Sequence, residues 1–155
     1  MHPRRRRRAA RRLWTALVAA LALPLSMLAT GTTPAQAASV QCSVDYRTND
    51  WGSGFTADLT LTNRGTDAIN GWTLNFEFAN GQSVYDLWGG TITQTGSIGQ
   101  NASIRNASYN ASIPAGATLD GRASGVGFNA LADDFANAQP PNFFLNGRRC
   151  AVALP

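Results

Sequence analysis

Three aromatic residues of this sequence lie in polar, glycine-rich surroundings, where burial in a core is difficult. They are Trp51, Trp88 and Tyr109. A flat aromatic ring can cover the apolar C–H face of a sugar ring, and a buried contact of this kind contributes about 1–3 kcal/mol. The three rings therefore predict a surface that stacks on sugars. The alternative is that one or more of them fills the rim of a folded domain, since single exposed apolar residues are normal.

The carboxylates are the second set of residues that could do chemistry. A glycosidase needs two acids that flank one bond in a cleft. Asp58 and Glu77 occupy polar positions of alternating segments, Asp86 lies two residues before Trp88, and Asp133-Asp134 is an adjacent pair that we expect to face solvent. We expect none of them to be catalytic, and a small glycoside hydrolase remains the alternative.

Residues 1–37 have the three parts of a secretory signal peptide. A basic run of arginines is followed by an apolar stretch over 13–29 and by an Ala-x-Ala cleavage site at 35–37. The apolar stretch is short for a membrane span, and none follows it. The alternatives are a retained N-terminal anchor and, from Arg11-Arg12, a twin-arginine signal, whose other residues fit poorly. We therefore expect a secreted, extracellular module at residues 38–155, without a membrane partner after cleavage.

Removal of the signal peptide reverses the sign of the charge. The remaining residues have six Arg and nine Asp or Glu, a net charge of −3, and they contain no Lys and no His. Without a basic patch we expect no nucleic-acid partner. Without His we expect no Ser-His-Asp or Cys-His site, no metal site and no cofactor. Cys42 and Cys150 lie at opposite ends of the module, and in an exported protein we expect them to form a disulfide.

The elements that must position these residues are predicted to be β-strands. Apolar and polar residues alternate with period two over 40–46, 55–62 and 72–78, and Asn-Gly or Gly-Gly turns separate such segments. Trp72 begins one of the apolar faces, so we expect it in the core. Shorter strands are expected around 91–95, 102–106, 118–128 and 142–145, and residues 129–138 have a composition that tolerates a short helix. This spacing predicts an all-β sandwich or barrel.

The order of motifs between the two cysteines resembles that of family 2 carbohydrate-binding modules. Each fragment alone is weak, but the series covers nearly the whole module. The fragments are Cys-x-Val-x-Tyr at 42–46, Asn-Asp-Trp-x-x-Gly-Phe-Thr-Ala at 49–57, Asn-Gly-Trp-Thr-Leu at 70–74, Gly-Gln-Ser-Val at 81–84 with Trp88, Asn-Ala-Ser-Tyr-Asn at 106–110, Ile-Pro-Ala-Gly at 113–116, Gly-Phe at 127–128, and Leu-Asn-Gly-Arg-Arg-Cys at 145–150.

The resemblance implies an antiparallel β-sandwich, jelly-roll or immunoglobulin-like, with a terminal disulfide Cys42–Cys150. It implies three coplanar surface aromatics at Trp51, Trp88 and Tyr109, and a structural role for Trp72. Polar neighbours that bond sugar hydroxyls would fall on Asn49 and Asp86. This sequence departs from the pattern at Tyr109, where Trp is common, and in a longer segment over 118–139.

Together these features predict a monomeric, non-catalytic protein that adsorbs to an insoluble β-1,4-linked polysaccharide, with cellulose first and chitin or xylan as alternatives. Such modules are usually joined to a hydrolase or oxidase through a linker. Neither is found in this sequence, so we expect a stand-alone module. A third class, a sandwich that mediates adhesion between proteins, also remains open.

Overall fold

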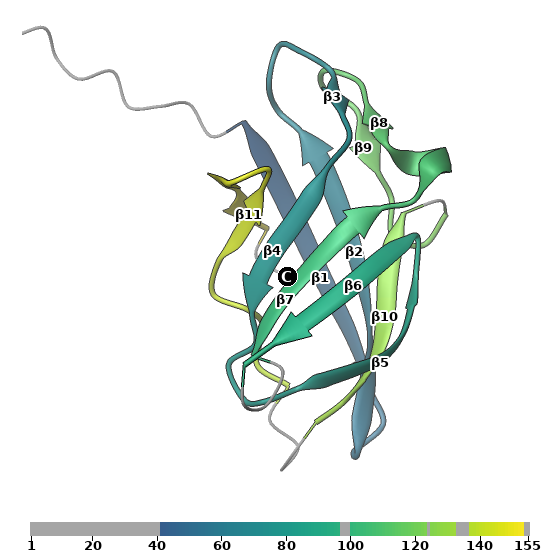
Figure 1. Cartoon of the computed structure of the whole chain (residues 1–155), viewed down its shortest axis with the longest axis vertical. Helices are drawn as coiled ribbons and strands as arrows, with labels where there is room; N and C mark the ends of the chain where they lie inside the picture. The colour runs from purple at the N-terminus through teal and green to yellow at the C-terminus, as the bar shows by residue number, and fades with distance from the viewer. Residues whose placement is uncertain (1–40, 97–99, 124, 133–136, 154–155) are drawn as a thin grey trace, which may run out of the picture. The chain divides into compact units, whose positions relative to one another are not determined.

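The computed structural model describes residues 41–96, 100–123, 125–132 and 137–153, which form a sandwich of two sheets (Figure 1). The first sheet has the strand order β13-β1-β2-β10-β5, with β9 also paired to β2, and the second has the order β12-β11-β4-β7-β6. Strands β3 and β8 pair with each other and form a separate small sheet. The strands are β1 Cys42–Asp50, β2 Gly54–Asn63, β3 Ile69–Asn70, β4 Thr73–Glu77, β5 Ser83–Trp88, β6 Gly90–Thr95, β7 Asn101–Asn106, β8 Ser112–Ile113, β9 Thr118–Leu119, β10 Val126–Leu131, β11 Phe143–Leu145, β12 Arg148–Arg149 and β13 Ala151–Val152.

The expected all-β sandwich is confirmed, and all but one of the strand pairs are antiparallel. The exception is β13, which pairs parallel with β1. Alternation along β2 is strict: its apolar positions are buried and the positions between them are partly exposed. Two hydrogen bonds within the turn close the hairpin between β1 and β2. The Trp51 N–H donates to Gly54 O (3.0 Å), and the Gly52 N–H donates to Asp50 Oδ1 (2.7 Å). The first sheet therefore presents one apolar and one polar face.

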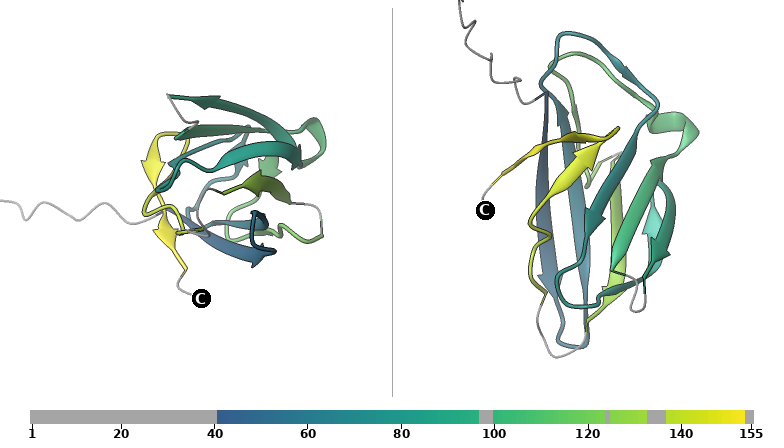
Figure 2. Two further views of the ribbon diagram at one scale, coloured as in Figure 1. Left: turned by 90° about the horizontal axis from the view of Figure 1, so that it is seen from below. Right: turned by 60° about the vertical axis from the view of Figure 1, so that its left-hand side comes forward.

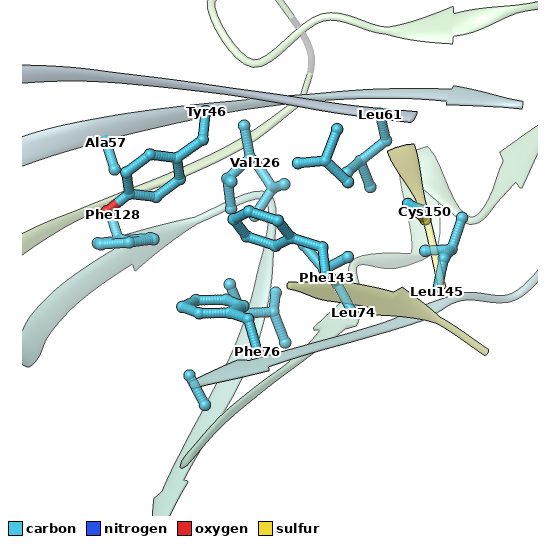
Figure 3. Packing of buried hydrophobic residues seen from close by; sticks show 14 of the residues in the cluster. Tyr46, Ala57, Leu61, Leu74, Phe76, Val126, Phe128, Phe143, Leu145 and Cys150 are labelled. Atoms are coloured by element: carbon cyan, nitrogen blue, oxygen red, sulfur yellow. The ribbon is translucent and has the colours of Figure 1, made fainter. Parts of the chain in front are cut away.

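The core lies between the two sheets and is rich in aromatic side chains (Figures 2 and 3). Phe76 of the second sheet stacks on Phe128 of the first, with ring centroids 6.3 Å apart. Phe143 lies 5.3 Å from Phe76 and 5.8 Å from Tyr46. Trp72 is only 1% exposed, as its place in the alternating pattern predicts. These contacts join the sheets, so the outer face of each is held by a rigid interior.

The expected disulfide Cys42–Cys150 is present, with the two Cα atoms 4.7 Å apart and a sequence separation of 108 between the partners. It ties the first strand to the last segment of the chain, next to the parallel pair β1 and β13. A covalent loop of this length stabilises a domain by about 4–5 kcal/mol in the chain-entropy model.

Two expectations need comment. The helix expected over 129–138 is wrong for residues 129–131, which continue strand β10, because Ala130 packs in the core while Asn129 faces outward, as strand alternation requires. The signal peptide expected at 1–37 lies outside the described residues. Among the residues that are described, no helix has the length and apolar character needed to cross a membrane.

The buried hydroxyl of Tyr46 yields a prediction about stability. Tyr46 is 6% exposed, and its hydroxyl has no hydrogen-bond partner within the described part of the chain. Burial raises the pKa of Tyr46 well above its usual value, because the phenolate would lose its hydration. An unpaired buried hydroxyl is a cost, so Tyr46→Phe should leave the free energy of unfolding unchanged or raise it by up to about 1 kcal/mol at pH 7.

The same shift predicts how the stability depends on pH. Above about pH 10 the unfolded chain ionises at Tyr46 before the folded chain does, so the folded state binds more protons and stability falls as pH rises. Tyr46→Phe should reduce this alkaline slope, measured by urea unfolding between pH 9 and 11. A variant that loses more than about 1 kcal/mol at pH 7 would show that the hydroxyl is bonded.

Candidate functional site

The outer face of the first sheet carries most of the residues that the sequence pointed to. Outward positions on neighbouring strands fall into rows, because paired residues point to the same side. One row runs from Asn49 through Thr56 and Asn129 to Asp86, across β1, β2, β10 and β5. The next row runs through Asp58 and Gly127 to Trp88. The β1–β2 hairpin and the strands β10 and β5, which are distant in sequence, thus contribute to one surface.

Trp51 lies over a glycine of the neighbouring strand. A Cβ added to Gly54 would lie 3.0 Å from Cζ2 and 3.2 Å from Cε2 of the Trp51 indole. Gly54 is an outward position of β2, since the next residue, Phe55, is fully buried. The ring therefore rests against the outer surface of the sheet and remains 47% exposed.

Trp88 has the same arrangement one strand further across. A Cβ added to Gly127 would lie 2.2 Å from Cζ2 and 2.5 Å from Cε2 of the Trp88 indole, so the ring occupies the space above this glycine. Gly127 lies between the buried residues Val126 and Phe128 and faces outward. Trp88 is half-buried. Strand geometry places the two indoles roughly 14 Å apart, with Gly127 opposite a β2 residue four positions from Gly54.

Between the two indoles lies a row of polar side chains linked by hydrogen bonds. Thr56 Oγ1 donates to Asn129 Oδ1 (2.9 Å), and Asn129 Nδ2 donates to Asp86 Oδ2 (3.2 Å). Asn49 is exposed at the other end of the row, opposite Thr56. An open depression beside Trp88 is lined in part by Asn49, Thr56 and Asp58. The depression beside Trp88 is therefore lined by side chains that can donate and accept hydrogen bonds.

The turn that carries Tyr109 is bonded by a buried network to the residue after Trp88. It lies in the 3₁₀ turn η1, Ser108–Asn110, and is 71% exposed. The indole N–H of Trp72 donates to Asn110 O (2.9 Å), and Asn110 Nδ2 donates to Gly89 O (2.7 Å). Gly89 directly follows Trp88, so the turn that carries Tyr109 is fixed at the end of β5. Trp72 thus connects the core to this turn.

Sequence reasoning missed the residues beneath and between the rings. Gly54 and Gly127 appeared only as members of the family motifs, and Asn129 was not singled out, because the packing of a ring on a glycine is not evident from the sequence. It also missed Tyr85, which is 60% exposed and directly precedes Asp86. Tyr85 lies in the same Tyr-Asp-Leu-Trp run as Trp88, which could have drawn attention to it. Strict alternation, however, would turn Tyr85 to the opposite side of the strand from Trp88.

The carboxylates do not form a glycosidase pair among the described residues. Glu77 is on β4, in the other sheet. Asp58 and Asp86 share the outer face of the first sheet, but they lie two strands and two residues apart, roughly 12 Å. Glycosidase carboxylates lie about 5–9.5 Å apart. Asp58 also accepts a bond from Arg122 Nε at 3.4 Å. Asp133 and Asp134 lie outside the described residues.

The second sheet provides a contrast. A hollow of about 500 Å³ on its outer side is lined by polar residues such as Asn75 and Ser103 and by two aromatic residues. Phe76 is buried in the core, so Phe144, which is 38% exposed, is the one ring of this lining that faces solvent. A single ring cannot form a row. Within the described ranges, no group of three His, Cys, Asp or Glu side chains is arranged to hold a metal ion.

Comparison with known proteins decides which family this geometry belongs to. Residues 42–150 match the model of the cellulose-binding domain. This chain belongs to the cellulose-binding domain family, the family 2 carbohydrate-binding modules. The matched span begins and ends at the two disulfide-bonded cysteines. A module of this family binds polysaccharide and is not itself catalytic.

The curated relatives are much longer than this family member, which matches only a part of each. It is 42% identical over 109 residues to Exoglucanase B of Cellulomonas fimi and 34% identical over 135 residues to Chitinase C of Streptomyces lividans. These matches cover 70% and 87% of this chain but only 9% and 20% of the relatives. The chitin-binding domain of Chi18aC from Streptomyces coelicolor has a similar structure, with a TM-score of 0.55, 28% identity, and 71% of this chain and 94% of that chain covered.

The packing of Trp88 on Gly127 can be tested in this family member. Gly127→Ala puts a methyl group where the indole lies, so the ring should lift from the sheet. Quenching of Trp88 fluorescence by acrylamide should increase, and the free energy of unfolding should fall by about 1–3 kcal/mol. The measurement uses residues 38–155 with Trp51→Phe, so that Trp88 is the only exposed tryptophan. Asn129→Ala, two positions along the same strand, is the control. Unchanged quenching in Gly127→Ala would contradict the packing.

Proposed function

We propose that this module is secreted and adsorbs, as a non-catalytic monomer, to the crystalline face of cellulose through Trp51, Trp88 and Tyr109. The observation that carries the proposal is the placement of two indole rings over glycines on one face of one sheet. Each ring has its Cζ2 and Cε2 atoms beside a glycine of the sheet and keeps part of its surface exposed to solvent, which suits contact with a flat ligand. The family relationship supports a polysaccharide as that ligand.

The spacing of the rings suits a long polymer. The two indoles are separated by roughly 14 Å, so one small sugar cannot contact both, whereas a polysaccharide chain can. Tyr109 would extend the row beyond Trp88, on the side of Gly89 to which its turn is bonded. Each indole contact adds affinity with little loss of side-chain entropy, because both indoles already pack against the sheet.

The polar row between the rings supplies the second part of the proposal. We assign to Asn49 and Asp86 the role of bonding hydroxyl groups at the edges of the sugar rings. Asp86 already accepts from Asn129, which leaves further lone pairs of its carboxylate for sugar hydroxyls. These bonds would orient the polymer, and the displacement of water from the apolar ring faces would supply most of the adsorption free energy.

Chitin is the second candidate ligand. The observation in its favour is the likeness to the chitin-binding domain of Chi18aC and to Chitinase C, which is balanced by the higher identity to Exoglucanase B and by the family match. Both polymers are β-1,4-linked and present the same kind of ring face. In both cases the proposed role is to hold the protein at an insoluble surface, on which a catalytic partner or the cell itself can act.

Loss of the rings should remove adsorption. We expect Trp51→Ala and Trp88→Ala each to lower the partition coefficient on microcrystalline cellulose by about 5- to 100-fold, and Tyr109→Ala to lower it less, because its ring is smaller. Adsorption isotherms of the purified variants measure this. Phe144→Ala, which removes an exposed ring from the opposite sheet, is the matched control and should bind as the unaltered protein does.

Retained adsorption of the double variant Trp51→Ala/Trp88→Ala would overturn the proposed face. The hypothesis of adhesion between proteins predicts that the double variant still binds. The hypothesis of a glycoside hydrolase predicts release of reducing sugar, which stops when Asp58, Glu77 or Asp86 is replaced. Thermal unfolding of each variant shows whether the fold is kept.

The choice of polymer can be tested separately. At equal accessible surface, we expect the partition coefficient on crystalline cellulose to exceed those on chitin and xylan by at least about threefold, a difference of roughly 0.7 kcal/mol. Parallel isotherms on the three polymers measure it. A higher coefficient on chitin would replace cellulose by chitin as ligand, and a higher coefficient on xylan would exclude both.

A further inference from the structure

Strand β5 interrupts its alternation directly beside the proposed binding row. Val84 and Leu87 both pack against the core, although three positions separate them. The two residues between them, Tyr85 and Asp86, are both exposed. The register with β10 shifts at this point, where Asn129 pairs with Asp86 but the next residue of β10 pairs with Val84. Tyr85 is therefore the extra residue of a β-bulge, and it faces outward together with Asp86.

The bulge is held by a side chain from the other sheet. Gln94 Oε1 accepts from the Val84 N–H (2.9 Å), and Gln94 Nε2 donates to Gln82 O (3.4 Å). The Gln82 side chain is fully buried, and its Oε1 accepts from the Asn80 N–H (2.9 Å). These bonds fix the edge strand just before Tyr85. The outward position of Tyr85 is thus part of the folded structure.

Tyr85 lies to one side of the line that joins the two indoles. Trp51 lies over β2, and Trp88 lies over β10 about four residues further along. Tyr85 is on β5, the strand beyond β10, at a height between the two rings. From strand spacing and rise, its offset from the line is roughly 7 Å. This is about the width of one sugar ring, so a single extended chain lying on both indoles does not reach it.

We propose that Tyr85 is a fourth aromatic binding residue, which contacts the neighbouring chain of a crystalline polysaccharide. The proposal rests on the proposed function, because it assumes that the indoles stack on one chain of the same surface. The bulge widens the contact from one chain to two. The phenol ring covers the apolar face of a sugar in the adjacent chain, and Asp86 lies beside it to accept hydroxyl hydrogen bonds.

A two-chain contact has a measurable consequence. A crystalline surface offers adjacent chains in register, whereas a soluble oligosaccharide offers one chain. Tyr85 should therefore contribute to adsorption on the crystal and contribute nothing to binding of the soluble ligand. Trp88 should contribute to both. This difference separates a selectivity residue from a residue of the common stacking row.

The test compares crystalline and soluble ligands with the full-length chain. Adsorption isotherms on microcrystalline cellulose are paired with calorimetric titration by cellohexaose, for Tyr85→Ala, Tyr85→Phe, Trp88→Ala and Phe144→Ala. We expect Tyr85→Ala to lower the partition coefficient on the crystal by roughly three- to tenfold and to change the Kd for cellohexaose by less than about twofold. Tyr85→Phe keeps the ring and should retain most of the adsorption, and Phe144→Ala should change neither value.

Two outcomes would overturn the proposal: adsorption of Tyr85→Ala equal to that of the unaltered chain, or an equal loss on crystal and oligosaccharide. The proposed function fails in a different way, through a Trp88→Ala variant that binds both ligands normally. Tyr85→Thr, which keeps a strand-forming side chain, repeats the test if the alanine variant loses its fold, as judged by thermal unfolding.

Discussion

The candidate site depends on one packing arrangement, in which an indole ring lies over a glycine on the outer face of a sheet. At Gly54 and Gly127 the absence of a Cβ leaves room for a ring directly above the backbone. Any larger residue there would force the ring to stand away from the sheet. A ring supported on one side loses little conformational entropy on binding and offers its other side to a flat ligand. Two such glycines on the adjacent strands β2 and β10 place two indole rings on the outer face of the first sheet.

The core and this surface are connected through Trp72. Its side chain is buried between the sheets, yet its indole N–H bonds the carbonyl of Asn110, whose amide in turn bonds Gly89 beside Trp88. The turn that carries Tyr109 is therefore fixed by the same residue that fills the interior. This buried network resists rearrangement, because breaking either bond leaves a further polar group unpaired inside the protein. On the far edge, Gln94 holds the bulge that turns Tyr85 outward.

Much of the fold follows from the sequence, because period-two alternation over 55–62 and 72–78 determines which residues face inward. The core position of Trp72 followed from that pattern. The pairing of Cys42 with Cys150 followed from the expected signal peptide and the family resemblance. The packing of the rings did not follow. Trp51 lies over Gly54 within one hairpin, whereas Trp88 lies over Gly127 only because β5 and β10, which are distant in sequence, pair in the fold. Tyr85 was missed for a related reason: a bulge breaks the alternation that the prediction relies on, and its cause, Gln94, lies on another strand. The helix expected over 129–138 failed at 129–131 because pairing with β2 and β5 outweighed local composition.

We propose that a sugar polymer lies on the indoles above the first sheet, and NMR can test this directly. Residues 38–155 are titrated with cellohexaose while the indole N–H signals of Trp51, Trp72 and Trp88 are followed. We predict large shifts of the indole N–H signals of Trp51 and Trp88 and smaller shifts of the backbone amides of Asn129 and Asp86. We predict no shift of the indole N–H of the buried Trp72 or of the backbone amide of Phe144 on the opposite sheet. Shifts confined to the second sheet, with the signals of Trp51 and Trp88 unchanged, would contradict it.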